Sequence, residues 1–342
     1  MKKLLFISLA LTAAISCSKD QTIGEPDPVA IEINNVFVEN STRANDISKS
    51  NLSNFGVYGF VKALSTNSEG LLFNKVRVAK EKDKYIYSPE QYWIGNAQYY
   101  FAAFAPYDNA EWTYTSTDAQ NGTITFDNQE AEANQDFLFA YTKPAVTPNK
   151  ITSAEKPGAV GFSFKHMLSR IKFSFTNGFE EGSNISLKIT DVTITNAHKN
   201  GSMVIEAGED KNWTVDEQTF AKVFGIVGTD DPKTANVDET ILIPQQGAST
   251  EHFYLIPADA TYNVTFNIAL YQAGILLDNY SRSATLGLEM KKGFSYDIKA
   301  TLNANNTSDD GELFPIEFTV NDVEGWGSFN DVNASVNNKQ NN

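Results

Sequence analysis

Cys17 is the residue whose type and position most clearly predict chemistry in this chain. It is the only cysteine, and it follows a positive start, an almost unbroken apolar run from Leu4 to Ile15, and Ser16. About 12 apolar residues are too few to cross a bilayer but match the apolar region of a secretory leader. We therefore expect residues 1–17 to form a lipoprotein signal peptide, with a lipid on Cys17 that anchors the chain at a membrane surface. An ordinary secretory leader with an incidental cysteine is the alternative.

The histidines and acidic residues do not form a recognisable catalytic or metal site. His166, His198 and His252 lie far apart and match no metal-ligand spacing, and there is no GxSxG elbow or Gly-rich phosphate loop. His166 continues an apolar alternation, so we expect it at the edge of a core face with one ring nitrogen hydrogen-bonded. The acidic segment 230–238 matches no calcium motif. We predict that the chain is not an enzyme and binds no metal or cofactor.

Composition limits the partners that the chain can have. Its formal net charge is -15, and nucleic acids and anionic lipids are polyanions, so neither is expected to bind. A hydrophobic content of 41% with 23 Phe is too high for a disordered chain. A single cysteine cannot form an intrachain disulfide, so the stability of the fold must come from burial and backbone pairing.

A strand is predicted close to the mature N-terminus, from Ile31 to Val38. This segment is apolar and β-branched enough to pair in a sheet. Strict alternation puts Ile31 and Ile33 on one face but Val36 and Val38 on the other. We therefore expect a β-bulge near Asn34-Asn35.

A protease site is predicted directly after this strand. The polar stretch 39–46 contains a single arginine, Arg43, followed by Ala44. An exposed and mobile arginine is what a trypsin-like protease can draw into its cleft. A cut after Arg43 would detach the first strand from everything that follows. The alternative is an ordinary loop with a chance arginine.

Alternation with a period of two dominates the rest of the chain and predicts an all-β fold. Strands with one buried face are what two antiparallel sheets need in order to pack as a sandwich. Turn-rich polar pieces separate the alternating runs. The clearest runs lie at 171–175, 185–189, 262–270, 294–302 and 314–320.

The segment 141–158 is predicted to connect two sandwiches. It contains three prolines and shows no alternation, as expected for a connection. We therefore expect an N-terminal sandwich over residues 31–157 and a C-terminal sandwich over residues 158–342. Residues 18–30 are expected to form a flexible tether between the lipid anchor and the folded part.

Aromatic residues raise a second class of function, which is glycan binding. Residues 92–101 are rich in Tyr, Trp and Phe, and exposed aromatic rings can stack on sugars. Alternation would bury about half of these rings, so core packing is favoured. A surface glycan-binding lipoprotein or adhesin would use exposed rings such as Trp93 or Trp112.

Several short motifs follow one another in a specific order along the mature chain. After the lipoprotein leader they are Ser41-Thr42-Arg43-Ala44, Phe55-Gly56-Val57-Tyr58-Gly59-Phe60, Tyr99-Tyr100-Phe101-Ala102-Ala103-Phe104-Ala105-Pro106, Phe162-Ser163-Phe164-Lys165-His166-Met167-Leu168-Ser169-Arg170 and Val323-Glu324-Gly325-Trp326. In this order and spacing they resemble the fimbrillin family of Bacteroidales. The resemblance covers nearly the whole mature chain.

The resemblance implies two tandem transthyretin-like (Ig-like) β-sandwiches, exported as a lipidated precursor to the cell outer membrane and exposed at the surface. In the family, an arginine-specific protease removes the first strand, and a strand from a neighbouring subunit fills the vacated groove to build a fimbria. Here Arg43 matches the cleavage position. The apolar residues on the strand to be lost are Ile31, Ile33, Val36 and Val38. The implied partners are other fimbrial subunits and a trypsin-like protease, and the role as stalk, tip or anchor subunit stays open.

A candidate for the donated strand lies near the C-terminus, at residues 314–320. The preceding segment 303–311 is polar enough to let it swing out, and Pro315 suits an edge position. The same strand could instead close its own C-terminal sandwich, and the sequence leaves both roles open. The alternating apolar residues of this candidate are Phe314, Ile316, Phe318 and Val320.

Overall fold

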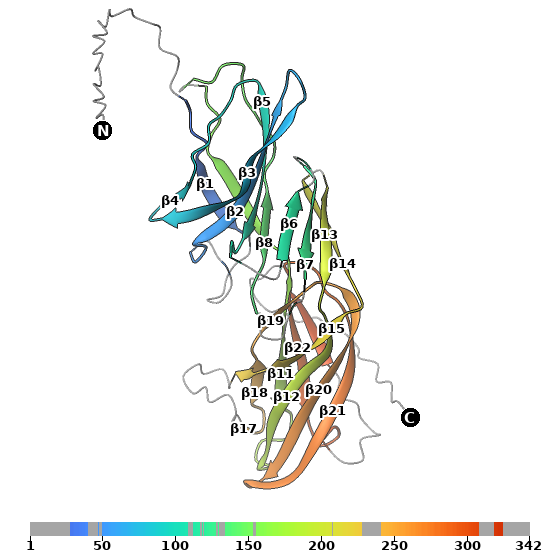
Figure 1. Ribbon diagram of the computed structural model, residues 1–342. Coiled ribbons are helices and arrows are strands. Elements are labelled where there is room, and N and C mark those ends of the chain that lie inside the picture. Colours follow the sequence, from blue (N-terminus) through green and yellow to red (C-terminus); the bar gives the residue numbers. More distant parts are fainter. Residues whose placement is uncertain are drawn as a thin grey trace, which may run out of the picture.

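Most strands of the N-terminal half gather at one end of an elongated molecule, and most strands of the C-terminal half gather at the other end (Figure 1). The computed structural model describes residues 28–39, 47, 50–108, 112–116, 118, 120–127, 129, 134–152, 155–206, 208–227, 241–307 and 318–323. All regular secondary structure within these ranges is β-strand, which confirms the predicted all-β fold. The predictions for five site residues and for the acidic segment 230–238 fall outside these ranges. The five residues are Cys17, Arg43, Ala44, Phe314 and Ile316.

The upper end of the molecule is an eight-stranded sheet that closes on itself. Its strands pair in the order β2-β3-β4-β1-β10-β8-β5-β9. Because β2 also pairs with β5, the seven strands from β2 to β5 in this order form a closed barrel, and β9 lies outside it. Closure removes the free edges that an open sheet would present. The strands are β1 (Ile33–Val38), β2 (Asn54–Ala63), β3 (Glu69–Glu81), β4 (Lys84–Tyr87), β5 (Ala97–Ala105), β8 (Leu138–Tyr141), β9 (Ala145–Val146) and β10 (Val160–His166).

A smaller sheet lies beside the barrel and covers the outer face of β5 and β8. It has the order β14-β13-β7-β6. A second core, with Phe104, Phe139 and Ile124 among its members, fills the space between the barrel and this sheet. The strands are β6 (Trp112–Ser116), β7 (Gly122–Phe126), β13 (Gly201–Glu206) and β14 (Glu209–Val215).

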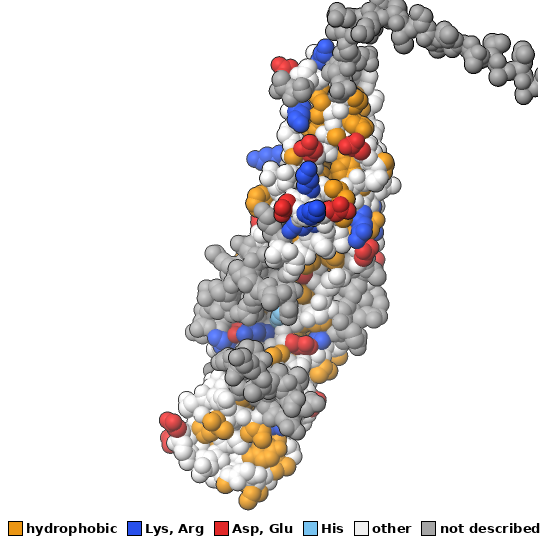
Figure 2. Space-filling view, turned by 90° about the vertical axis from the view of Figure 1, so that its left-hand side faces the viewer, with side chains coloured by type: hydrophobic (Ala, Val, Ile, Leu, Met, Phe, Trp, Pro, Cys, Tyr) orange, Lys and Arg blue, Asp and Glu red, His pale blue; other side chains and the backbone are white. Residues whose placement is uncertain are grey.

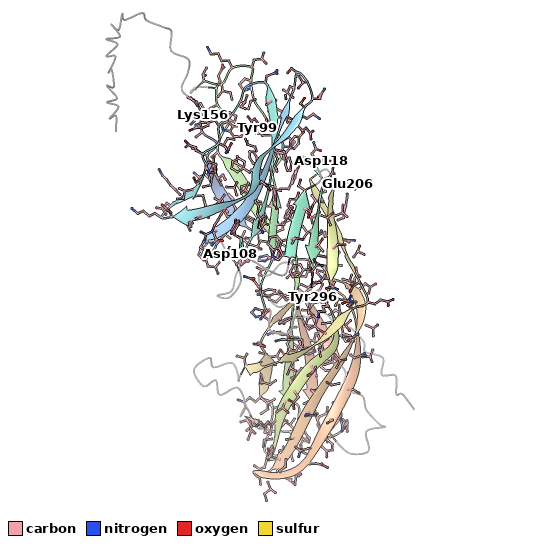
Figure 3. All side chains as sticks on the ribbon, in the orientation of Figure 1. Tyr99, Asp108, Asp118, Lys156, Glu206 and Tyr296 are labelled. Atoms are coloured by element: carbon pink, nitrogen blue, oxygen red, sulfur yellow. The ribbon has the colours of Figure 1, made fainter. Side chains whose placement is uncertain are left out.

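Two further sheets form the lower end of the molecule and share a third core. Figure 3 shows Tyr296 in this lower half and Tyr99 in the barrel, and each side chain belongs to the core of its own half. One sheet contains β16 (Ile226–Val227), β18 (Gly247–Thr250), β11 (Ser169–Asn177), β22 (Ser295–Leu302), β23 (Phe318–Val323) and β19 (Phe253–Leu255). The other contains β15 (Thr219–Phe224), β12 (Ile185–His198), β20 (Asp259–Gln272), β21 (Ile275–Glu289) and β17 (Ile241–Leu242).

The clearest alternating runs form strands at or very near the predicted positions. The runs 171–175, 185–189 and 262–270 lie within β11, β12 and β20, and the run 294–302 forms β22 with a start one residue later. The period-two pattern is sufficient here because each of these strands buries one face in the lower core.

Strand pairing crosses the boundary that the sequence suggested at residue 157. β10 comes after residue 157 in sequence, but it pairs with β1 and β8 in the barrel. β13 also comes after it, yet it pairs with β7. These partners are far away in sequence, so proline content and loss of alternation in 141–158 carried no information about them. At the N-terminal side, the predicted tether 18–30 ends inside the fold, because the Val29 carbonyl accepts a 2.9 Å hydrogen bond from the Trp93 amide.

The two tryptophans expected to be exposed in a glycan-binding protein are buried. Trp93 is 6% exposed and Trp112 is 4% exposed. Trp93 packs edge-on against Tyr99 in the barrel, and Trp112 packs against Phe104 and Phe137 in the second core. Core packing, which the sequence favoured for these rings, is confirmed for both tryptophans, and the alternative of a sugar-stacking surface on either ring is excluded because both fill space between sheets.

His166 has the structural role that the sequence indicated. It lies at the end of β10, is buried, and its Nδ1 is 2.9 Å from a carboxylate oxygen of Asp136, which is also buried. The pair joins β10 to the segment that precedes β8. Burial of two polar groups is tolerated here because they hydrogen-bond to each other.

Gly56 makes the barrel sensitive to a single methyl group. A Cβ at this position would lie 2.0 Å from Cζ of the buried Phe104 ring. We expect Gly56→Ala to lower the free energy of unfolding by about 1–3 kcal/mol, the usual cost of overpacking, as measured by denaturant unfolding. Gly287→Ala in β21 is the matched control, because no heavy atom lies within 4 Å of its added Cβ. Equal stability of the two variants would contradict this prediction.

Candidate functional site: the groove that holds the first strand

β1 closes the barrel by filling the space between β10 and β4. It runs parallel to β10, with Val36, Phe37 and Val38 opposite residues 162–164. The Val160 amide donates a 2.7 Å hydrogen bond to the Glu32 carbonyl, and the Glu39 amide donates a 2.8 Å bond to the Phe164 carbonyl. This edge of β1 is therefore paired at both of its ends, with an interruption between Ile33 and Val36.

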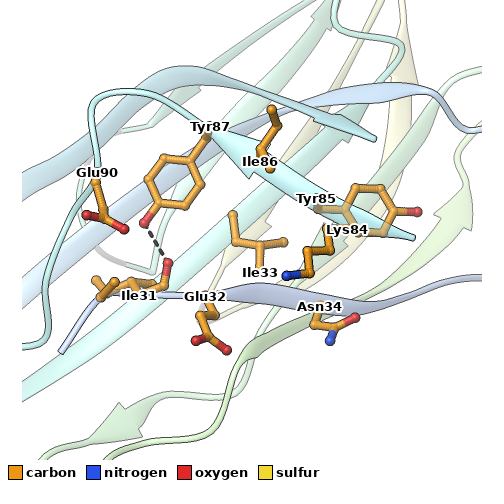
Figure 4. Close-up of a pocket in the computed structure, with 10 residues that line it drawn as sticks. Ile31, Glu32, Ile33, Asn34, Lys84, Tyr85, Ile86, Tyr87 and Glu90 are labelled. Carbon is orange, nitrogen blue, oxygen red and sulfur yellow. Dashed lines mark hydrogen bonds between the residues drawn. The ribbon is translucent and has the colours of Figure 1, made fainter. Parts of the chain in front are cut away.

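The opposite edge of β1 is held more loosely. Ile33 and Tyr85 are the only residues that pair between β1 and β4. Beyond that point the strands separate, and a hollow of about 310 Å³ lies between them (Figure 4). Its walls come from residues 30–34 on one side and from residues 84–87 with Glu90 on the other.

Two hydrogen bonds hold the start of the first strand across this hollow. The Tyr87 hydroxyl donates a 2.6 Å bond to the Ile31 carbonyl, drawn as the dashed line in Figure 4, and the Ile31 amide donates a 2.8 Å bond to the Gln91 carbonyl. Burial raises the pKa of Tyr87 above its ordinary value. The hydroxyl therefore keeps its proton at neutral pH and remains a donor.

The apolar side chains of the first strand form part of the barrel core. Ile31, Ile33 and Val36 are 1%, 5% and 1% exposed, and the partly buried Val38 packs against the same core. The core on which they lie includes the Phe55 ring, whose centroid is 5.7 Å from that of Phe162 and 5.3 Å from that of Phe164. Removal of this strand would uncover an aromatic groove.

The irregularity predicted near Asn34 is present. Ile33 pairs with Val160 and Val36 pairs with Phe162, so β1 carries one more residue than β10 over this stretch. Asn35 takes up the extra length with a φ of 50°, a region that asparagine enters more readily than most residues. The bulge brings Val36 onto the same side as Ile33, and both are buried.

The C-terminal candidate strand is part of its own sheet in this structure. β23 pairs antiparallel with β22, from Ala300 opposite Phe318 to Ser295 opposite Val323. Phe318 is buried, and its ring centroid is 5.9 Å from that of Phe266 and 6.2 Å from that of Phe173. Of the two roles left open by the sequence, closure of the C-terminal half is the one observed. The described part of this strand begins at Phe318, and residues 314–317 of the predicted strand lie outside the described residues.

Sequence reasoning missed the second wall of the groove. In the segment Lys84–Tyr87, the exposed Lys84 and Ile86 alternate with the partly buried Tyr85 and Tyr87, whose rings pack against the barrel core. Such alternation predicts a short strand. The pattern was too brief to stand out, and nothing local indicated that it would lie beside residues 30–34. Gly161, on the β10 wall, was also missed; a Cβ at this position would lie 3.3 Å from the Asn35 carbonyl oxygen, so it leaves room for the bulged backbone of β1.

The described residues show an arrangement suited to binding a strand, and no group of acidic, His or Cys side chains among them could hold a metal ion. In that same part of the chain, no helix is long and apolar enough to cross a membrane. The face shown in Figure 2 carries Lys or Arg and Asp or Glu side chains side by side over its upper half, so it presents no single-sign patch there. Backbone edges and apolar pockets are what the groove offers to a partner.

Comparison with protein families identifies the group to which the chain belongs. A family model described as fimbrillin-like matches residues 42–322. The chain belongs to the fimbrillin-like family. The match begins after β1, so the strand that closes the barrel lies outside the matched range. Membership confirms the predicted resemblance and associates this fimbrillin-like protein with fimbriae at the cell surface.

Solved structures provide further similarities to this fimbrillin-like protein. A structure described as a cell adhesion protein from Bacteroides ovatus is 15% identical, with a TM-score of 0.49, and the match covers 88% of this chain and 98% of that one. The fimbrial anchor protein Mfa2 from Porphyromonas gingivalis is 10% identical, with a TM-score of 0.39, over 89% of this chain and 100% of that one. Comparison with curated protein sequences gives no match.

Proposed function

We propose that this protein is a structural subunit of a cell-surface fimbria that assembles by strand exchange. It is exported as a lipoprotein with its lipid on Cys17, and it reaches the outer membrane as a precursor. A trypsin-like protease cuts between Arg43 and Ala44 and separates the first strand from the remainder. A strand from a neighbouring subunit then takes its place in the barrel.

The observation that carries this proposal is the position of β1. It is joined to the barrel by parallel pairing with β10 and by a short contact with β4, and together with the preceding Ile31 it supplies three nearly fully buried side chains. The next strand in sequence, β2, is paired with β3 and β5 and does not touch β1 in the sheet order. The chain can therefore be cut between β1 and β2 without disturbing any other pair of the barrel.

The vacated groove would be a strong binding site for another strand. Its walls would present unpaired backbone groups of β10 and β4 together with an uncovered aromatic core, and such edges recruit added strands. Burying three apolar side chains contributes roughly 5 to 9 kcal/mol before the cost of ordering the incoming strand. That amount is enough for a long-lived joint between subunits.

The C-terminal region of a neighbouring subunit is the proposed donor. β23 has β22 as its partner and ends the path of its sheet, so it can be released without breaking a second ladder. Release would uncover Phe318 in the lower core. Insertion into the groove of a neighbour would bury the apolar surface of the donor strand again, which offsets the cost of its release. The net driving force is then the burial of the groove that the first strand left empty.

N-terminal sequencing of protein released from the cell surface tests the maturation step. We expect the released chains to begin at Ala44, because the first strand must leave before a neighbour can bind. An Arg43→Gln chain, which a trypsin-like protease cannot cut at this position, is the control and should stay unprocessed. Assembled fimbriae whose subunits still begin at Cys17 would contradict the proposal.

A further inference from the structure

The lower pole of the molecule, which is the end that holds the turn between β20 and β21, carries exposed apolar side chains (Figure 1). Figure 2 also shows hydrophobic side chains at this end. Further up the outer face of the same sheet, the rows that cross β12, β20 and β21 are polar, for example Thr190, Asn267 and Ser281, as expected for a face in water. The exposed apolar residues at the pole are Ile241, Ile243, Ile275, Leu276 and Leu277.

Two of these leucines lie in a bulge on the edge strand. Leu270 is opposite Asp278 and Tyr271 is opposite Leu276, so Leu277 is an extra residue in β21. In such a bulge two residues of one strand oppose a single residue of the other. β21 also ends the path of its sheet. A run of three exposed apolar residues, 275–277, on a strand at the end of a sheet favours a contact with a partner.

The opposite end of the molecule, the upper pole, presents a second group of exposed apolar side chains. Leu64, Ile94 and Val146 are all exposed, and their three segments meet in the barrel. The Leu64 amide donates a 3.0 Å hydrogen bond to the Asn96 carbonyl, and the Thr147 hydroxyl donates a 2.7 Å bond to the Ile94 carbonyl. The two poles therefore match in character.

The charges beside the two poles are opposite in sign. At the lower pole, the Ala273 amide donates a 3.0 Å hydrogen bond to the Asn184 carbonyl, so the loop 178–184 lies next to the tip of the hairpin. This loop has two exposed glutamates, Glu180 and Glu181, and no base. At the upper pole, the segment 143–156 that contains Val146 has three exposed lysines and one acid, and Figure 3 labels one of the lysines, Lys156. Opposite charges around an apolar centre align two surfaces and select the partner.

The path of the chain brings these two poles together when subunits exchange a strand. β22 ends at the lower pole, where the Gly178 amide donates a 2.7 Å hydrogen bond to the Leu302 carbonyl. The first strand begins at the upper pole, where the Val29 carbonyl accepts its bond from the Trp93 amide. Ten residues, 308–317, precede the described part of β23, and they span at most about 35 Å. A donated strand that follows the direction of β1 therefore leaves one copy at its lower pole and enters the next at its upper pole.

We propose that the lower pole of one copy docks on the upper pole of the next copy, as an interface separate from the exchanged strand. Leu276 and Leu277 pack against Ile94 and Val146, and the acidic loop 178–184 faces the lysines of the upper pole. This inference rests on the proposed function and adds a surface that strand exchange alone does not require. A few aliphatic side chains bury far less than the roughly 800 Å² per partner of a stable interface. The poles therefore associate only between subunits that an exchanged strand already holds together.

Thiol cross-linking between the poles tests this contact. All chains carry Cys17→Ser, so that only introduced thiols react with a short bifunctional thiol reagent. The test chain carries Val146→Cys and Leu277→Cys. The matched control carries Val146→Cys and Val223→Cys, because Val223 is 55% exposed, close to the 52% of Leu277. Val223 lies opposite Thr193 of β12, roughly 20 Å along the strand from the pole.

The expected result, after cleavage and assembly, is a ladder of covalently linked subunits in the test chain and at least about tenfold less linked product in the control chain. Light scattering before addition of the reagent measures assembly separately from linkage. Assembly of both chains with equal linkage, or with no linked product in the test chain, would overturn the contact between the poles and leave strand exchange intact. A failure of both cleaved chains to assemble would overturn the proposed function, and the contact between the poles with it.

Discussion

Cleavage after Arg43 is expected to convert the purified protein from a monomer into oligomers that grow with concentration. The reason is the groove between β10 and β4, which loses its covalent link to β1 and can exchange that strand for the C-terminal strand of another molecule. The measurement is size-exclusion chromatography with light scattering before and after limited treatment with a trypsin-like protease. Mass spectrometry of the oligomer fraction should show that the fragment ending at Arg43 is absent.

The control for this experiment is the Arg43→Gln chain under the same protease treatment. It should remain monomeric, which separates the effect of this cut from that of cuts elsewhere. A cleaved chain that has lost its first strand, retains Phe318–Val323 and stays monomeric at high concentration would rule out polymerisation through this groove. A monomer that keeps the first strand bound after the cut would call for mild denaturant to release it before the same measurement.

Val36→Asp is expected to destabilise the uncut precursor by about 3–5 kcal/mol, the range for an uncompensated buried charge. Val36 is 1% exposed and lies in the barrel core with Phe162 and Phe164. The measurement is denaturant unfolding of the uncut chain. The same substitution should leave the cleaved chain as able to assemble as the unmodified protein, because residue 36 is removed with the first strand.

Phe37→Asp is the matched control on the neighbouring position. Phe37 is 49% exposed, on the side of β1 that faces away from the core. Its substitution should change the free energy of unfolding by about 0.5 kcal/mol or less, as surface changes usually do. If Val36→Asp and Phe37→Asp were equally mild, β1 would not be part of the cooperative core. If Val36→Asp blocked assembly after cleavage, the first strand would not be removed from the fibre.

The first strand illustrates how much of the candidate site follows from local sequence. The alternation of Ile31 and Ile33 and its failure at Val36 predicted both a strand and a bulge, and the structure has both. A bulge is visible in sequence because it changes which residues share a face. The strands β11, β12, β20 and β22 of the lower half were predictable for the same reason, since each buries a face in the lower core.

The other components of the site depend on contacts between distant residues. The wall made by Tyr85 and Tyr87 is about fifty residues from the strand it contacts, and the β10 wall is more than a hundred residues away. The burial of Trp93 and Trp112 also depends on which sheets pack together. No local sequence pattern indicates which distant strands and sheets pack together.

By itself, the sequence determined the all-β class, the bulged first strand and the single arginine that follows it. Only the tertiary structure decided that β1 closes a barrel, that β10 belongs to that barrel beyond residue 157, and that Gly161 lies opposite the bulge. The physical reason is that periodicity specifies which face of a strand is buried, whereas strand partners are chosen by side-chain packing across the whole fold.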